Sequence, residues 1–444
     1  MPKTKNIYIC QSCGFESPQW LGQCPSCKNW NTFEETIVAA PTKASARLGG
    51  LRRAGGYSAK PISLSQVKNK ETERTSSGSD EFDRVLGGGF VSGQAVLLAG
   101  DPGIGKSTLL TQIAKNMPKN KILYVCGEES LAQVKVRAER MGYKAENLLV
   151  IAETDADVIA DTIEQTVGIS LVIVDAIQSI TSDEYTGFAG SIGQVRAGTQ
   201  KLTNMAKKTG VPVILVGHVT KEGTVAGPKV LEHIVDTVLY LEGDSQHLFR
   251  ILKTTKNRFG PVSEVGIFEM TDKAMIDVTN PSEMFLAEIA GSKASGSCVS
   301  VVMEGFRPIL FEIQALTTKT FFGYPRRTTS GFPVNRLQVL IAILEKRCGL
   351  NLGDQDVYIN VAGGFKVNEY AVDLAVCLAV ASSVKNKPIK SKTVAFGEVG
   401  LAGEVRNISH QDKRIKEAKK LGYTNVINPQ KIKSVKEAIS LAIS

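Results

Sequence analysis

The chain has 444 residues, of which 43% are hydrophobic and 22% charged, and its formal net charge is +9. This length predicts two or three domains, the composition excludes a largely disordered chain, and the basic balance favours a polyanionic partner. Because no apolar run could span a bilayer and the N-terminus lacks the pattern of a secretory signal, we expect a cytoplasmic protein without a membrane partner.

Four cysteines are crowded into the first segment. Cys10 and Cys13 form one C-x2-C pair, and Cys24 and Cys27 form a second pair after ten intervening residues. Two such pairs close a tetrahedron of sulfurs around zinc and leave no open coordination position. The spacing therefore predicts a structural Zn²⁺ in a ribbon over residues 1–34, with a rubredoxin-type iron centre as the alternative.

After a polar, basic segment at 35–75, predicted as a linker, residues 76–283 are predicted to form an α/β domain. Short apolar runs alternate there with helical stretches such as 106–117. Continuous apolar runs separated by helices are typical of a mainly parallel sheet that is covered on both faces. The predicted strands lie at 95–100, 121–126, 147–152, 170–176 and 212–217.

The first of these runs ends in a complete P-loop motif. Its glycines let backbone N–H groups surround phosphates at the N-terminus of the following helix. We expect Lys106 to reach the β- and γ-phosphates and the hydroxyl of Ser107 to hold Mg²⁺. The residues predicted to bind ATP or ADP are Gly100, Asp101, Pro102, Gly103, Ile104, Gly105, Lys106, Ser107 and Thr108.

Acidic residues follow two further runs. Asp175 ends the run LVIVD in the manner of a Walker B strand, and we expect it to orient Mg²⁺ through water. Glu128 and Glu129 follow the run at 121–126, which we place beside the P-loop strand, where a carboxylate can polarise the attacking water. We assign this role to Glu128, and Glu129 remains the alternative.

The stretch from Ser76 through glycines 87–89 to the P-loop resembles the segment leading into a RecA/KaiC-type core. The residues Lys256-Asn257-Arg258-Phe259-Gly260 are similar to the signature of the bacterial RadA (Sms) family. The four-cysteine segment and an additional C-terminal domain complete that family's three-part plan, so the resemblance covers nearly the whole chain. It implies a DNA-stimulated ATPase that acts on branched recombination intermediates as a homo-oligomer, a hexameric ring, with recombinase or replication proteins as partners.

The same resemblance implies a catalytic role for Lys256 and Arg258, which would reach a neighbouring subunit's nucleotide and offset charge on its γ-phosphate. A basic hairpin turn exposed to water is the alternative. The family pattern also places a γ-phosphate sensor at His218, for which a structural hydrogen-bonded histidine is the alternative.

Two segments are predicted to contact single-stranded or branched DNA. Residues 182–199 are glycine-rich and are interpreted as a loop, and a second loop follows the run at 212–217. In RecA-like cores the corresponding loops line the central axis. Because lysine and arginine displace condensed counterions, the predicted phosphate partners are Arg196, Lys221 and Lys229.

Residues 284–444 are predicted as a separate α/β domain. The spacing of Leu337, Leu340, Ile341 and Leu344 indicates a helix face, residues 356–364 alternate as a strand does, and 370–384 are typical of a buried helix.

This last region resembles the proteolytic domain of Lon. Ala371 occupies the position of the nucleophilic serine, and Asp412 that of the lysine base. We therefore expect a non-proteolytic scaffold for assembly or DNA binding. The basic stretches at 326–327 and 413–416 face either DNA or solvent.

These features together predict a DNA motor, of helicase or branch-migration type, that couples ATP hydrolysis to the processing of recombination and repair intermediates. Two alternatives remain. An ATP-dependent protease of the Lon type is disfavoured by Ala371. A KaiC-like regulatory ATPase without DNA binding is disfavoured by the basic balance and by the motif at 256–260.

Overall fold

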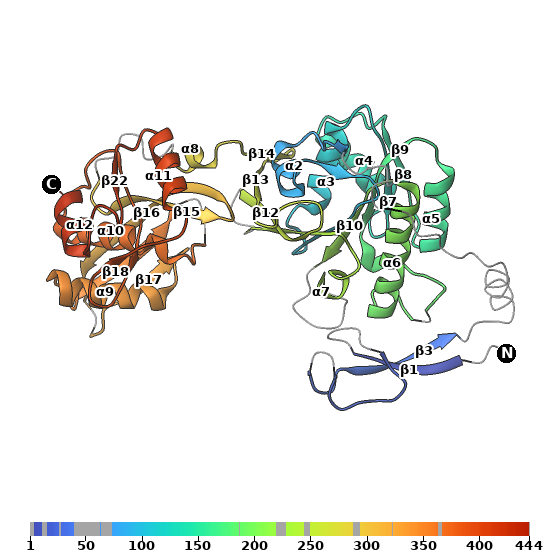
Figure 1. Ribbon diagram of the computed structural model, residues 1–444, viewed down its shortest axis with the longest axis horizontal. Coiled ribbons are helices and arrows are strands. Elements are labelled where there is room, and N and C mark those ends of the chain that lie inside the picture. The colour runs from blue at the N-terminus through green and yellow to red at the C-terminus, as the bar shows by residue number, and fades with distance from the viewer. Residues whose placement is uncertain are drawn as a thin grey trace. The chain divides into compact units, whose positions relative to one another are not determined.

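The structure is a computed structural model that describes residues 4–10, 16–25, 28–39, 63, 73–185, 187–218, 228–243, 249–286, 294–321, 323–362 and 366–443. The chain forms two compact units, Met1–Asp277 and Val278–Ser444 (Figure 1). The predicted boundary between 283 and 284 lies inside α8 (Pro281–Leu286), which packs on the C-terminal unit. The hydroxyl of Ser282 on α8 accepts the N–H of Leu310 in that unit.

A three-stranded antiparallel sheet opens the chain, with strand order β2-β1-β3. Its strands are β1 (Thr4–Cys10), β2 (Glu16–Ser17) and β3 (Phe33–Ala39). Strand β1 pairs with β3 along its whole length, from Thr4 opposite Ala39 to Cys10 opposite Phe33. Strand β3 therefore continues past residue 34, where the ribbon is predicted to end.

A nine-stranded sheet carries the rest of the N-terminal unit, with order β14-β13-β12-β11-β6-β10-β9-β7-β8. Strands β6 to β11 pair in parallel, and β12 to β14 pair antiparallel at one edge, which confirms the predicted mainly parallel sheet. The strands are β6 (Ala95–Gly100), β7 (Lys121–Cys126), β8 (Leu148–Ile151), β9 (Ile169–Asp175), β10 (Val213–His218), β11 (Thr237–Glu242), β12 (Phe249–Asn257), β13 (Val265–Met270) and β14 (Met275–Asp277).

Helices cover both faces of this sheet because its strands are apolar on both sides. On β6, Val96 and Leu98 join one buried cluster, and Ala95 and Leu97 join the other, as the two-residue period of a strand requires. The first cluster includes residues of α2 (Asp80–Leu86), α3 (Lys106–Asn116) and α4 (Leu131–Arg140). The second includes residues of α5 (Ala156–Gln165), α6 (Ile192–Thr209) and α7 (Pro228–Leu231).

Part of the predicted glycine-rich loop at 182–199 is helical, because α6 begins at Ile192. The glycine that suggested a loop serves packing instead. A Cβ atom at Gly198 would lie 3.1 Å from Cγ2 of Ile180, next to the short 3-10 helix η2 (Ile177–Ser179). The missing side chain lets α6 approach this segment closely, a use of glycine that a single sequence does not distinguish from a turn.

The C-terminal unit is built on a six-stranded sheet with order β17-β18-β16-β15-β19-β22. Its strands are β15 (Ser297–Glu304), β16 (Arg307–Lys319), β17 (Arg327–Ser330), β18 (Gln355–Val361), β19 (Thr393–Ala395) and β22 (Asn425–Ile427). The helices are α9 (Val334–Cys348), α10 (Asp373–Lys385), α11 (Gln411–Lys420) and α12 (Val435–Ala442), with the 3-10 turn η5 (Tyr370–Val372) before α10. The short pair β20 (Glu398–Val399) and β21 (Val405–Arg406) completes the unit.

In each of the two basic stretches of this unit, one arginine is held by internal contacts. Arg414 is fully buried, where it pairs with Glu369 and donates to the carbonyl of Val301 at 2.5 Å. Arg327 donates to backbone carbonyls, including that of Leu352 at 2.9 Å. The buried guanidinium group of Arg414 is therefore not available as a DNA contact, whereas Arg327 is partly exposed and Lys413 and Lys416 are exposed.

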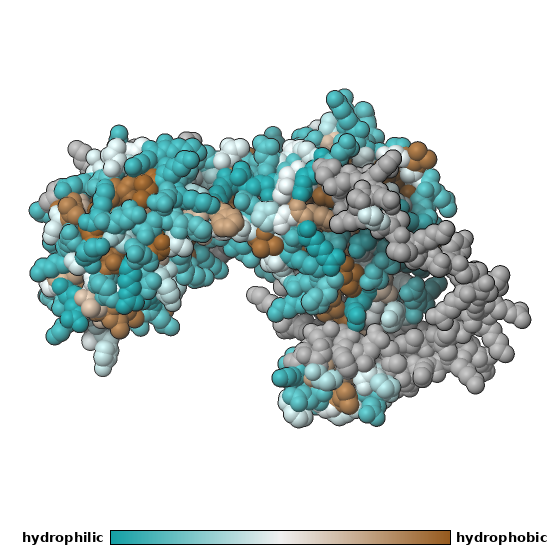
Figure 2. Space-filling model, viewed as in Figure 1, coloured by the Kyte–Doolittle hydropathy of each residue, from teal (hydrophilic) through white to brown (hydrophobic). Residues whose placement is uncertain are grey.

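Apolar residues are scattered over a mainly hydrophilic face in the view of Figure 2. Within the part of the chain that the structure describes, no helix combines the length and the apolar character needed to cross a membrane.

The buried Arg414 predicts a large loss of stability on substitution. Replacing it by methionine keeps most of the volume but removes the cation that pairs with the carboxylate of Glu369, at a cost of about 3 kcal/mol. Calorimetric melting of the full chain should show a lower transition temperature for Arg414→Met. Lys413→Ala is the control. The ammonium group of this exposed lysine lies over the ring of Phe306, 4.6 Å from its centroid, and such a contact contributes about 1 kcal/mol or less to stability. Equal melting of the two variants would contradict the assignment.

Candidate functional site

The candidate site lies where parallel strands end at one edge of the nine-stranded sheet. The strand order β6-β10-β9-β7 brings the P-loop after β6, His218 at the end of β10 and Asp175 at the end of β9 to the same edge. Glu128 follows β7 at this edge. From the sequence we expected β7 to lie beside the P-loop strand β6. This expectation is wrong, because β10 and β9 lie between the two strands. The carboxyl edge of such a sheet is where ligands bind.

Lys106 is the first residue of α3, and only 4% of it is exposed. Its ammonium group donates to the carbonyls of Gly100 at 2.8 Å and Asp101 at 3.0 Å. Burial lowers the pKa of Lys106, and the nearby carboxylates, that of Asp175 most strongly, oppose this shift. The loop thus holds a desolvated cation at the position where the motif requires a phosphate contact.

The P-loop backbone needs glycine at two positions. Gly103 has φ of +75° and Gly105 has φ of +112°, which is the left-handed region that side chains disfavour. Gly105 directly precedes α3, and among the described residues no side chain caps this helix. The N–H groups of its first turn are therefore available for the oxygens of an anion. The predicted binding residues from Gly100 to Thr108 are continuous with this loop and turn.

His218 bridges Lys106 and Glu128. Its Nδ1 lies 3.1 Å from Nζ of Lys106, and its Nε2 lies 3.2 Å from Oε2 of Glu128. Because an ammonium group only donates, Nδ1 accepts, and Nε2 carries the proton that Glu128 accepts. This hydrogen bond from His218 is the main reason that the pKa of Glu128 is lowered, and partial burial opposes it. A carboxylate in this environment stays ionised at neutral pH.

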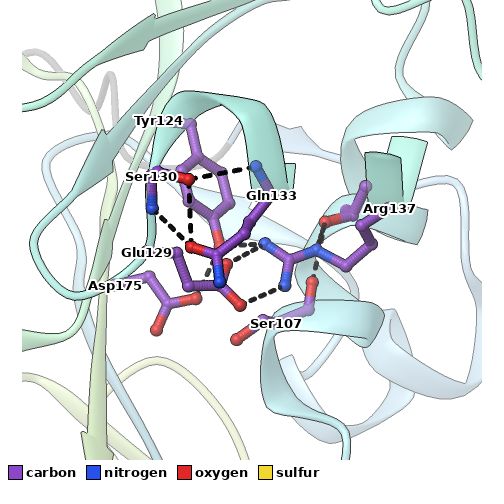
Figure 3. Close-up of polar contacts among 8 residues, drawn as sticks. Ser107, Tyr124, Glu129, Ser130, Gln133, Arg137 and Asp175 are labelled. Atoms are coloured by element: carbon purple, nitrogen blue, oxygen red, sulfur yellow. Dashed lines mark hydrogen bonds and ion pairs between the residues drawn. The ribbon is translucent and has the colours of Figure 1, made fainter. Parts of the chain in front are cut away.

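Glu129 and Asp175 belong to a different network (Figure 3). The guanidinium of Arg137 on α4 makes two bonds to the carboxylate of Glu129, at 2.8 and 2.5 Å. The hydroxyl of Tyr124 on β7 donates to Oδ2 of Asp175 at 2.5 Å. The two glutamates are therefore distinguished by their partners, since Glu128 contacts a histidine and Glu129 is held by an arginine.

The predicted trans-acting cations contact the turn that follows α7. Lys256 donates to the carbonyls of Glu232 at 2.6 Å and Val235 at 2.8 Å. Arg258 pairs with Asp236 at 3.1 Å, and its side chain is half exposed. Burial lowers the pKa of Lys256, and the adjacent positive charge of Arg258 lowers it further. Both cations lie on one segment, β12 and the turn after it.

The predicted DNA contacts lie on separate elements. Arg196 is half-buried on α6, and Lys229 is exposed on α7. Lys221 lies outside the described residues. Arg196 and Lys229 thus lie on two different helices, and contact of these residues with DNA stays a prediction.

In the N-terminal ribbon, Cys10 and Cys24 are both fully buried, and Sγ of Cys10 lies 3.1 Å from the hydroxyl of Thr32. Cys13 and Cys27 lie outside the described residues. Within the described part of the ribbon, the buried cluster consists of Cys10, Cys24 and Phe33. So small a core cannot sustain a fold by burial alone, and two buried thiols, one at the end of β1 and one in the loop between β2 and β3, fit a zinc ion that would supply the missing stability.

In the C-terminal unit, the position of the expected nucleophile holds no hydroxyl. Ala371 lies in η5 with 1% of it exposed, and its carbonyl accepts the N–H of Gly397 at 2.7 Å. Asp412 is exposed in the first turn of α11.

Sequence reasoning missed Tyr124 and Arg137. A signal for the first was present, since a tyrosine inside the apolar strand KILYVC needs a partner for its hydroxyl. No comparable signal pointed to Arg137, which lies on the amphipathic helix α4 and resembles any surface arginine.

The site geometry is that of a RecA-like P-loop ATPase. Relatives define it more narrowly. The DNA repair protein RadA of Bacillus subtilis strain 168 is 48% identical over 432 residues, which cover 97% of this chain and 93% of the relative. RadA of Streptococcus pyogenes serotype M6 is 48% identical, with 97% and 94% covered, and RadA of Listeria monocytogenes is 45% identical, with 97% and 93% covered. The chain therefore belongs to the RadA family of DNA repair proteins.

Three family models each match one part of the chain. An AAA domain matches residues 65–224, a rubredoxin metal binding domain matches 8–35, and the ChlI subunit of Mg-chelatase matches 334–432. Among solved structures, the RadB recombinase is 24% identical with a TM-score of 0.37, over 46% of this chain and 99% of that chain. A KaiC-like protein from Pyrococcus horikoshii is 22% identical with a TM-score of 0.39, over 46% and 99%. The fold is mixed α/β, with an all-β zinc ribbon, a RecA-like core and a ChlI- or Lon-protease-like C-terminal domain.

The bond from His218 to Glu128 predicts a pH effect. Removing the donor in His218→Ala raises the pKa of Glu128, because that bond is the main cause of its depression. A base is lost as pH falls through its pKa, so the acidic limb of the ATPase pH profile should move to higher pH. The exposed His233 supplies the control, because His233→Ala should leave the limb in place. An unshifted limb in His218→Ala would contradict the coupling.

Proposed function

We propose that this chain is a DNA-stimulated ATPase that assembles as a hexameric ring in the cytoplasm. The ring is a motor of the helicase or branch-migration type, and it processes single-stranded or branched DNA in homologous recombination and repair. The observation that supports it best is the convergence of Lys106, His218, Glu128 and Asp175 at one sheet edge. Membership of the RadA family, whose relatives are named DNA repair proteins, supports the DNA substrate.

Within this proposal the P-loop from Gly100 to Thr108 holds the phosphates of ATP, with Lys106 beside the β- and γ-phosphates. Ser107 would hold Mg²⁺ and Asp175 would orient it through water, and the bound ion would supply positive charge to the phosphate oxygens. Glu128 accepts a proton from the attacking water, because its depressed pKa keeps it ionised.

Lys256 and Arg258 act on the nucleotide of a neighbouring subunit. Their present contacts support this role in one respect, since the partners of Lys256 are neutral carbonyls that do not cancel its charge. Arg196, Lys221 and Lys229 are the proposed DNA contacts, and a recombinase or replication protein is the proposed protein partner. Cys10, Cys13, Cys24 and Cys27 hold a structural Zn²⁺ in the ribbon.

The two alternatives carry less support. A Lon-type protease needs a nucleophile and a base. At the position of the nucleophile, Ala371 offers only a buried methyl group, and at the position of the lysine base the chain has the exposed carboxylate of Asp412. A KaiC-like regulatory ATPase without DNA binding would lack a reason for the net charge of +9.

DNA is expected to stimulate the ATPase rate. Single-stranded DNA should raise the ATPase rate of the native chain, Lys106→Ala should abolish hydrolysis, and Lys256→Ala should lower the stimulated rate about 100-fold or more. Lys253→Ala is the matched control, because this lysine lies on the same strand and pairs with Glu242. A rate that is indifferent to DNA but lost in Lys106→Ala would favour the regulatory ATPase, and degradation of casein would favour the protease.

Substitution is expected to affect the turnover rate differently at the two glutamates, Glu128 and Glu129. Glu128→Gln removes the proposed base and should lower kcat by about 100-fold or more while nucleotide binding persists. Glu129→Gln keeps a hydrogen-bonding partner for Arg137 and should cost less than about tenfold. Steady-state hydrolysis with fluorescent-nucleotide binding measures both effects. The reverse order of losses would assign the base to Glu129.

A further inference from the structure

Behind Asp175 lies a set of polar side chains that an apolar core would not need. Tyr124 is fully buried in β7, and 5% of Asp175 is exposed. A phenylalanine at 124 would fill the same space without a hydroxyl group to satisfy. The hydroxyl of Tyr124 instead donates to Oδ2 of Asp175 at 2.5 Å, a short bond to a charged acceptor.

Arg137 controls this hydroxyl from the other side. Its Nη2 lies 3.3 Å from the oxygen of Tyr124, and the side chain is 10% exposed. Because a guanidinium only donates, it occupies a lone pair of the phenol oxygen and directs the single hydroxyl proton toward Asp175. The hydroxyl proton of Tyr124 is therefore directed to Oδ2 of Asp175.

The guanidinium is itself fixed at two further points. Glu129 receives two of its N–H groups, and Nε donates to the hydroxyl of Thr111 at 3.1 Å. Thr111 lies on α3, where its hydroxyl donates to the carbonyl of Ser107 at 2.8 Å. The network consequently joins α4, β7, β9 and the helix that follows the P-loop, as the dashed contacts in Figure 3 display.

We propose that Tyr124 and Arg137 are positioning residues for ATP hydrolysis, an inference that rests on the function proposed above. Arg137 orients the hydroxyl of Tyr124, and this hydroxyl commits Oδ2 of Asp175, so that Oδ1 is left for the magnesium side. Glu129 belongs to the same support, because its carboxylate neutralises and aims Arg137. Substituting a group that orients a carboxylate at a metal site typically lowers metal affinity by about 10- to 100-fold.

Tyr124→Phe tests this role, with Tyr143→Phe as the matched control. Tyr143 is also buried, but its hydroxyl donates to Asn147 at 2.7 Å and to the carbonyl of Ala114 at 3.3 Å, away from Asp175. Fluorescent ADP binding to the full chain is titrated with Mg²⁺ and repeated in EDTA. We expect Tyr124→Phe to raise the Mg²⁺ midpoint about tenfold and to leave binding in EDTA unchanged. Tyr143→Phe should leave both quantities unchanged.

A second variant, Arg137→Lys, keeps the charge but cannot hold Glu129, Thr111 and Tyr124 together, and should raise the Mg²⁺ midpoint in the same direction. Melting temperatures identify any variant that fails to fold. An unchanged Mg²⁺ midpoint in folded Tyr124→Phe overturns the proposal, and so does an equal change in Tyr143→Phe, which would indicate a packing effect. If the native chain binds Mg²⁺ and ADP but hydrolyses no ATP, the proposed function fails, and the titration still decides whether Tyr124 positions Asp175.

Discussion

A buried ammonium group is the constraint on which the rest of the site depends. Lys106 is almost completely removed from water, and a cation in that position is tolerated only when acceptors surround it. Two carbonyls of the loop and a ring nitrogen of His218 supply them. The loop that carries these carbonyls turns into α3 through Gly103 and Gly105, both of which adopt positive φ. The glycines, the lysine and the histidine are therefore parts of one electrostatic solution.

The order of the strands extends this solution across the sheet. Strand β10 lies between β6 and β9, so the side chain that ends it is the natural bridge from Lys106 to Glu128. Beyond β9, Tyr124 on β7 holds Asp175 from behind. The three carboxylates of the site therefore differ in their hydrogen-bond donors. Glu128 accepts from an imidazole, Asp175 from a phenol and Glu129 from a guanidinium.

Sequence reasoning recovers what depends on local pattern. The strands of the core, the loop from Gly100 to Thr108, the acid that ends a strand at Asp175 and the missing hydroxyl at Ala371 are all readable from adjacent residues. What it misses depends on contacts between distant residues. Gly198 resembles a loop glycine until Ile180 is known to lie against it, and the position of β7 beyond β9 depends on the crossover connections rather than on any residue in the strand. Arg137, too, differs from a surface arginine only through Glu129, Thr111 and Tyr124.

The buried pair of Arg414 and Glu369 couples two segments of the C-terminal unit to each other. A guanidinium does not lose its proton in proteins, so it cannot serve as the neutral amine that a serine nucleophile needs. Arg414 lies two positions after Asp412, and Glu369 two positions before Ala371, so the pair joins the two segments in which that chemistry would have to be rebuilt. Because one charged pair ties these two segments together, substitutions in one segment are constrained by the other, and the two are expected to vary as a unit.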